Sequence, residues 1–168
     1  MSSAGPARTR AFVALGANIG EPVAHLRAAV EDIRKLPDTT LVARSSLYRS
    51  APVGLVNQPD FINAVVAVDT ALTPLALLRE LLAIEARHGR VRSIPNAPRT
   101  LDLDLLLHGD SRQGSPELTL PHPRMHQRAF VLLPLLEIAP DAQIPDLGAA
   151  AEFLPDVAGQ AITRFEPL

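Results

Sequence analysis

The chain has 168 residues, a formal net charge of −2 and no cysteine, and 47% of its residues are apolar. This length and apolar content are typical of one folded domain. The near-neutral charge argues against a nucleic-acid binder, and no apolar run reaches the roughly 20 residues that span a bilayer. The lack of cysteine excludes disulfides and thiolate metal sites. We therefore expect a cytoplasmic protein without nucleic-acid or membrane partners, with a disordered lead over residues 1–10 and a single domain over 11–168. We also expect it to be a monomer.

Hydrophobic periodicity predicts an alternation of strands and helices. The predicted strands span 11–15, 41–48, 61–68 and 101–107, and the predicted helices span 22–36, 126–138 and the stretch from Pro74 to just before Gly89. The helix that begins at Pro74 is expected to be capped by Thr73 and to carry on one side Leu75, Leu78, Leu81, Leu82 and Glu85. After Pro140 we expect at most a short helix near 148–154. The order β-α-β-β-α-β predicts a ferredoxin-like α+β fold, an α/β sandwich with an antiparallel sheet and a C-terminal helical extension.

The segment Leu101-Asp102-Leu103-Asp104-Leu105 is the strongest chemical signal in the sequence. Residues two apart in a strand share one face, so Asp102 and Asp104 point the same way. Two adjacent carboxylates repel each other unless a cation lies between them, and Mg²⁺ commonly binds one or two carboxylates together with substrate phosphate. The alternative is a solvated strand face, or acids paired with Arg99.

Basic and polar side chains near this segment suggest a phosphate site. Arg90 and Arg92 alternate along an extended stretch, and guanidinium groups bind phosphate oxygens bidentately; the alternative is a solvated basic loop. Glu85 at the end of its helix fits a ligand contact or an ion pair with arginine equally well. In the segment 121–128, His122 and Arg128 favour a phosphate contact over a zinc site, whereas His25 and His108 are interpreted as lone histidines at surface or satisfied positions.

A loop over 49–58 followed by Phe61 and Asn63 suggests a pocket for a flat ring. Phe61 and Asn63 lie two apart on one strand face and offer a stacking ring and an amide. The alternative is a core phenylalanine and a turn asparagine.

Together these segments resemble the 6-hydroxymethyl-7,8-dihydropterin pyrophosphokinase family of folate synthesis, from Ala11 to about Asp146. The resemblance is carried by the motifs Leu15-Gly16-Ala17-Asn18, Gln58-Pro59-Asp60-Phe61-x-Asn63, Glu85-x-x-x-Gly89-Arg90-x-Arg92, Pro98-Arg99-Thr100-Leu101-Asp102-Leu103-Asp104 and Leu120-Pro121-His122-Pro123-Arg124. It implies that 11–168 is a pyrophosphokinase domain that transfers pyrophosphate from ATP to the pterin hydroxymethyl group and releases AMP.

The resemblance also implies a role for individual residues. Two Mg²⁺ ions would be bound by Asp102 and Asp104. ATP, the co-substrate, would be contacted by Glu85, Arg90, Arg92, Arg99, Leu105, Thr119, His122 and Arg128, and the catalytic set would be Arg90, Arg92, Arg99, Asp102 and Asp104. The pterin would be enclosed by Gly16, Ser50, Val53, Phe61, Asn63 and Phe130, with the two phenyl rings sandwiching it.

The chain departs from the family pattern in the loop before Pro98-Arg99, where many members carry an aromatic residue and Ile94-Pro95-Asn96-Ala97 has none. Ser50-Ala51 replaces a Thr-Pro pair of some members, and His126 replaces a lysine. Two alternatives remain open: a ferredoxin-like module that binds a ligand without catalysis, and a nucleotidyl transferase that uses the same magnesium site.

Overall fold

The computed structural model describes residues 7–52, 57–89 and 100–168. Its longer elements, in chain order, are β1 (Thr9–Ala17), α1 (Pro22–Arg34), β2 (Thr39–Arg44), β3 (Ser46–Ser50), β4 (Phe61–Thr70), α2 (Pro74–Arg87), β5 (Asp102–His108), α3 (Ala129–Ile138) and β10 (Ile162–Pro167). Shorter elements are β6 (Gln113–Gly114), β7 (Thr119–Leu120), the 3-10 helix η1 (Met125–Gln127), β8 (Gln143–Ile144), β9 (Gly148–Ala149), η2 (Ala150–Phe153) and α4 (Leu154–Val157).

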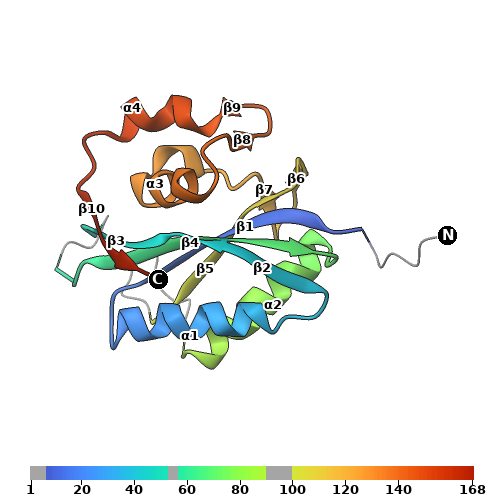
Figure 1. Ribbon diagram of the computed structural model, residues 1–168, viewed down its shortest axis with the longest axis horizontal. Coiled ribbons are helices and arrows are strands. Elements are labelled where there is room, and N and C mark those ends of the chain that lie inside the picture. Colours follow the sequence, from blue (N-terminus) through green and yellow to red (C-terminus); the bar gives the residue numbers. More distant parts are fainter. Residues whose placement is uncertain (1–6, 53–56, 90–99) are drawn as a thin grey trace.

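One large sheet organises the molecule. Its strand order is β10-β3-β4-β1-β5, with β2 also paired to β4, and the strand pairings among the described residues are antiparallel. Helices α1 and α2 lie on one face of the sheet, and α3 and α4 lie over the other (Figure 1). The predicted α+β fold with an antiparallel sheet and a C-terminal helical extension is confirmed.

Strand alternation divides the core into two halves. In β1, Val13 and Leu15 belong to a buried cluster with α1 and α2, whereas Phe12 and Ala14 belong to a second cluster with α3. Because successive side chains point to opposite faces, a strand covered on both faces reads as a continuous apolar run, which is what the segment 11–15 shows.

The predicted strand over 41–48 is in fact two strands that meet at Ser45. The Ser45 backbone amide donates to the Val65 carbonyl at 2.9 Å, and its hydroxyl accepts from the Val65 amide at 2.9 Å. The backbone and the side chain of Ser45 thus satisfy both backbone groups of Val65 in β4. The strand is interrupted at Ser45, and β2 before it and β3 after it both pair with β4.

Two helix predictions need correction. The Thr73 hydroxyl caps α2 by accepting from the Ala76 amide at 3.2 Å, as predicted. However, its buried residues are Leu77, Leu81, Ile84 and Glu85, and Leu82 is exposed, so the predicted apolar side was rotated. The helix predicted over 126–138 is interrupted at Arg128, whose backbone is extended, so η1 and α3 are separate and Pro134 lies inside α3.

Strand residues were missed near both ends of the described fold. Thr9 and Arg10 fell in the predicted lead but belong to β1, and residues 1–6 lie outside the described residues. Strand β10 was missed because most of its side chains are exposed and leave no apolar alternation to find. Within the described ranges, no helix combines the length and the apolar character that crossing a membrane needs.

Candidate active site

A row of four residues crosses the sheet at one end. Tyr48 of β3 pairs with Asn63 of β4, Asn63 pairs with Gly16 of β1, and Gly16 pairs with Asp102 of β5. Directly paired residues of neighbouring antiparallel strands project to the same face. The sheet register therefore brings the predicted metal ligand Asp102 and the predicted pterin residues Gly16 and Asn63 into one line.

Asp102 and Asp104 share the face of the sheet opposite α1 and α2. Between them Leu103 is buried in the cluster formed with these helices, whereas both aspartates remain partly exposed. Their partners in β1 are Gly16 and Ala14, two of the smallest residues, so the β1 side chains add little bulk beside the carboxylates.

The two aspartates fit the implied magnesium. In the part of the chain that the structure describes, no group of three or more His, Cys, Asp or Glu side chains gathers around a common point. A site with two carboxylates suits Mg²⁺, which usually keeps several waters and takes substrate phosphate oxygens, better than a metal enclosed by protein ligands. Their oxygens would complete the coordination shell together with a phosphate-bearing substrate.

Glu85 holds the backbone between the two aspartates. It is 2% exposed, and its Oε2 accepts a hydrogen bond from the Leu103 amide at 2.6 Å. A buried carboxylate is costly unless its oxygens are hydrogen-bonded, which explains an acidic residue at a helix C-terminus, where the helix dipole opposes it. Among the described contacts Glu85 is thus a structural acceptor for β5; its predicted contact with ATP stays a prediction.

The predicted ring pocket lies next along the row. Asn63 and Ser50 are buried, and the Asn63 amide donates to the Ser50 hydroxyl at 2.7 Å. Ser50 pairs with Phe61, which is half-buried, and a Cβ added to Gly16 would lie 3.4 Å from Asn63 Oδ1. The polar groups of the pocket are therefore held in fixed orientations against the Gly16 backbone.

The segment before α3 carries His122 and Arg128, and Phe130 lies in the first turn of α3. The His122 amide donates to the Leu106 carbonyl of β5 at 3.0 Å, and the Arg128 guanidinium lies 5.4 Å from the centre of the Phe130 ring. Burial, followed by the charge of Arg128, lowers the pKa of His122 to about 4, although Asp102 opposes this shift. His122 Nδ1 accepts from the Arg124 amide at 3.2 Å, so the neutral ring carries its proton on Nε2.

The remaining predicted site residues divide into two groups. Thr119 is exposed in β7 and Leu105 is buried in the core, and their proximity to adenine or ribose stays a prediction. The predicted Val53, Arg90, Arg92 and Arg99 lie outside the described residues.

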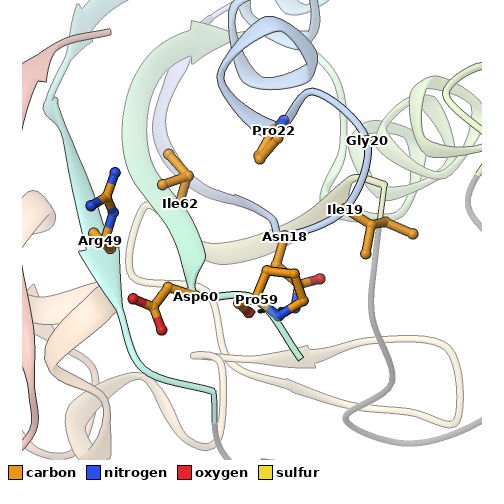
Figure 2. A pocket seen from close by; sticks show the side chains of 8 residues that line it. All are labelled: Asn18, Ile19, Gly20, Pro22, Arg49, Pro59, Asp60 and Ile62. Atoms are coloured by element: carbon orange, nitrogen blue, oxygen red, sulfur yellow. Dashed lines mark hydrogen bonds between the residues drawn. The ribbon is translucent and has the colours of Figure 1, made fainter. Parts of the chain in front are cut away.

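A hollow of about 510 Å³ opens on the opposite face of the same sheet end, lined by Asn18, Ile19, Gly20, Pro22, Arg49, Pro59, Asp60 and Ile62 (Figure 2). Its most buried polar member, Asn18, donates to Gln58 Oε1 at 2.7 Å and to the Pro59 carbonyl at 3.0 Å. Asn18 therefore ties the end of β1 to the chain that enters β4. It lies in the Leu15-Gly16-Ala17-Asn18 motif, but the sequence alone gave no reason to assign it a role.

Two of the histidines behave differently from each other. His108 is buried and its Nε2 lies 2.9 Å from the Leu72 carbonyl, so of the two predicted alternatives, a surface or a satisfied position, the second is confirmed. His25 is not a lone residue, because its Nδ1 lies 2.9 Å from Nδ1 of His88. This contact joins α1 to the end of α2 and could not be found from spacing along the chain.

The fold and the row define an α+β domain that carries a carboxylate pair and a group of amide, hydroxyl and phenyl side chains on one face at one end of its sheet. The family described as 7,8-dihydro-6-hydroxymethylpterin-pyrophosphokinase (HPPK) matches residues 12–140. The chain belongs to this family.

Similar proteins agree with this assignment. The chain is 48% identical to a 2-amino-4-hydroxy-6-hydroxymethyldihydropteridine pyrophosphokinase of Pseudomonas aeruginosa over 92% of this chain and 96% of that protein. It is 44% identical to the protein of the same name from Haemophilus influenzae, over 94% of this chain and 98% of that one. The fold is similar to that of Plasmodium falciparum HPPK-DHPS with pterin and p-hydroxybenzoate, with a TM-score of 0.69 and 14% identity over 92% of this chain and 42% of that one. The chain thus spans less than half the length of that solved protein.

Proposed function

We propose that the chain transfers the pyrophosphoryl group of ATP to the hydroxyl of 6-hydroxymethyl-7,8-dihydropterin, giving the pterin diphosphate and AMP in tetrahydrofolate biosynthesis. Membership of the pyrophosphokinase family supports this activity. The observation that carries the proposal is the row from Asn63 through Gly16 to Asp102, which brings the proposed pterin residues into line with the carboxylate pair. We also propose that the protein acts as a monomer in the cytoplasm.

The pterin end of the site relies on fixed polar groups. A pterin presents several hydrogen-bond donors and acceptors on one edge, and Asn63 and Ser50 offer a matching amide and hydroxyl whose positions their mutual bond fixes. Phe61 and Phe130 would cover the two faces of the ring, and Arg128 holds the Phe130 side chain. Binding the ring here orients its hydroxymethyl group toward Asp102.

At the end of the site that would bind the ATP phosphates, we propose that Asp102 and Asp104 hold two Mg²⁺ ions. The metal would neutralise phosphate charge and orient the β-phosphorus for attack. His122, neutral and protonated on Nε2, would donate a hydrogen bond to the triphosphate without adding a charge, and Arg128 would add one. In the reaction, the hydroxyl oxygen bonds to the β-phosphorus, the bond from that phosphorus to the bridging oxygen of AMP breaks, and the hydroxyl proton leaves to solvent.

Product analysis tests this proposal directly. The purified protein is incubated with ATP, Mg²⁺ and 6-hydroxymethyl-7,8-dihydropterin, and the products are separated by chromatography. We expect AMP and a diphosphorylated pterin in equal amounts. Release of pyrophosphate would instead indicate nucleotidyl transfer, and binding of the pterin without turnover would indicate a module without catalysis.

Asn63→Ala tests the pterin pocket. Removing an amide that pairs with a buried polar edge leaves substrate groups unsatisfied, and we expect kcat/KM for the pterin to fall by about 100-fold or more. The apparent KM for ATP should change little, because the amide lies at the pterin end. Steady-state kinetics with each substrate varied measure both, and Gln143→Ala, which removes an exposed amide elsewhere, is the matched control. An equal loss of affinity for both substrates would contradict this division of the site.

A further inference from the structure

A chain of three side chains joins α1 to the end of α2. His25 Nδ1 lies 2.9 Å from His88 Nδ1, the rings meet edge to face, and His88 Nε2 lies 3.3 Å from Asp32 Oδ2. The His88 side chain is only 11% exposed. His25 and Asp32 are seven residues apart, two helical turns, and therefore lie on the same side of α1. They contact the two nitrogens of the His88 ring.

The contacts fix how the protons are arranged. A carboxylate only accepts, so His88 donates from Nε2 to Asp32. When both rings are neutral, His88 Nδ1 is then an acceptor, and His25 must donate to it from its own Nδ1. With both rings neutral, these contacts require one tautomer of each ring, and they join the end of α2 to α1.

The same helical turn reaches the proposed metal site. Glu85 lies three residues before His88 and accepts from the Leu103 amide at 2.6 Å, midway between Asp102 and Asp104. The His88 amide in turn caps α2 by donating to the carbonyls of Ile84 and Glu85. Moving the end of α2 would therefore move the carboxylate that holds β5 at the aspartate pair. On the other side α1 is fixed, since Leu26, Ala29, Val30 and Ile33 are buried in the core.

We propose that His88, held by His25 and Asp32, is a positioning residue for the Asp102–Asp104 pair and acts through Glu85. This inference rests on the proposed function, in which that pair holds the metal. The proposed function assigns His88 no substrate contact, so its loss should lower the rate of the chemical step rather than the affinity for the pterin.

His88→Phe is the variant that tests this, because it keeps an aromatic ring of similar size and removes both hydrogen bonds. The first measurement needs no activity. In a ¹⁵N-correlated NMR spectrum of the full chain, the short bond to a carboxylate should place the Leu103 amide proton downfield, and in His88→Phe this resonance should move upfield. Long-range imidazole correlations in the wild type should show protons on His88 Nε2 and His25 Nδ1.

Kinetics provide the second measurement. We expect His88→Phe to lower kcat by about 10- to 100-fold, as a displacement of catalytic groups by about 1 Å does, with the KM for the pterin unchanged within about twofold. His88→Gln, whose amide can donate to Asp32 and accept from His25, should recover most of the rate. Arg34→Met, which breaks the exposed pair with Glu31 on the same helix, should leave kcat and the Leu103 resonance unchanged.

The Leu103 resonance and the kinetics test the positioning role of His88 and the proposed function separately. An unchanged Leu103 resonance and an unchanged kcat in a folded His88→Phe variant would overturn the positioning role. Equal losses in His88→Phe and His88→Gln would also overturn it, because size rather than hydrogen bonding would then matter. If the wild type forms no diphosphorylated pterin but the Leu103 resonance still moves, the link from His88 to β5 stands and the proposed function fails.

Discussion

Asp102→Ala and Asp104→Ala are each expected to abolish pyrophosphoryl transfer while leaving the fold intact. The two carboxylates lie on one strand face beside Gly16 and Ala14. In the proposed function, each would contribute ligand oxygens to a metal that neutralises phosphate charge. A metal contributes several kcal/mol to such a transition state, so losing one ligand should lower kcat by about 1,000-fold or more. The AMP released per unit time, measured at saturating ATP, pterin and Mg²⁺, gives the rate.

Stability measurements distinguish loss of the site from loss of the fold. Both aspartates are partly exposed, so removing one carboxylate should change Tm little. Asp141→Ala removes an exposed carboxylate elsewhere and should keep the full rate. Turnover near the wild-type level in either site variant would refute the metal assignment.

The alternation of leucine and aspartate over 101–105 was sufficient to predict the face of the aspartate pair. Strand periodicity is a local property, and burial of Leu101, Leu103 and Leu105 confirms it. The apolar positions of α1 were equally readable, because Leu26, Val30 and Ile33 follow a helical period and are buried.

Features that depend on contacts between distant segments could not be predicted. The pairing of Gly16 with both Asn63 and Asp102 requires the sheet register, and nothing local announces the bond between His25 and His88. Strand β10 forms because it pairs with β3, and its own sequence shows no apolar pattern typical of a strand. The resemblance to a family supplied residues for the site, whereas the structure supplied the reason that several of them lie in one row.

Glu137 of α3 contacts the row at Tyr48, next to the proposed pterin residues. Its carboxylate accepts from the Tyr48 hydroxyl at 2.7 Å, the Ser46 amide at 3.0 Å and the Ser46 hydroxyl at 2.8 Å. The exposed Arg164 of β10 adds a longer ion pair at 3.8 Å. Tyr48 pairs with Asn63, so this one side chain connects α3, β3 and β10 next to the pocket.

These contacts shift the pKa values of Glu137 and Tyr48. Burial alone would raise the pKa of Glu137, but the hydrogen bonds from Tyr48 and Ser46 and the charge of Arg164 outweigh it and lower the pKa below its ordinary value. Burial, followed by the hydrogen bond to Glu137, raises the pKa of Tyr48 to about 12. The cluster is therefore in its stabilising form, with an ionised Glu137 and a neutral Tyr48, throughout the neutral range.

Glu137→Gln should lower the free energy of unfolding at pH 7 by about 1–3 kcal/mol, the usual contribution of hydrogen bonds to a charged group. Because the folded pKa of Glu137 is lowered, the unfolded chain binds the proton more tightly. The stabilisation is thus complete above the unfolded value of about 4.3 and is lost as pH falls through the folded value. Urea unfolding at pH 7 and at pH 3 should show the difference between wild type and variant shrinking at the lower pH.

Tyr48→Phe extends the test to the alkaline side. Unfolded tyrosine ionises near pH 10, whereas folded Tyr48 stays neutral to about 12, so wild type should lose stability between these values and the variant should lack that loss. Glu152→Gln, which neutralises an exposed carboxylate, is the control and should leave the acid profile unchanged. If Glu137→Gln and wild type instead differed by the same amount at pH 3 and pH 7, the ionised form of Glu137 would not be what stabilises the cluster.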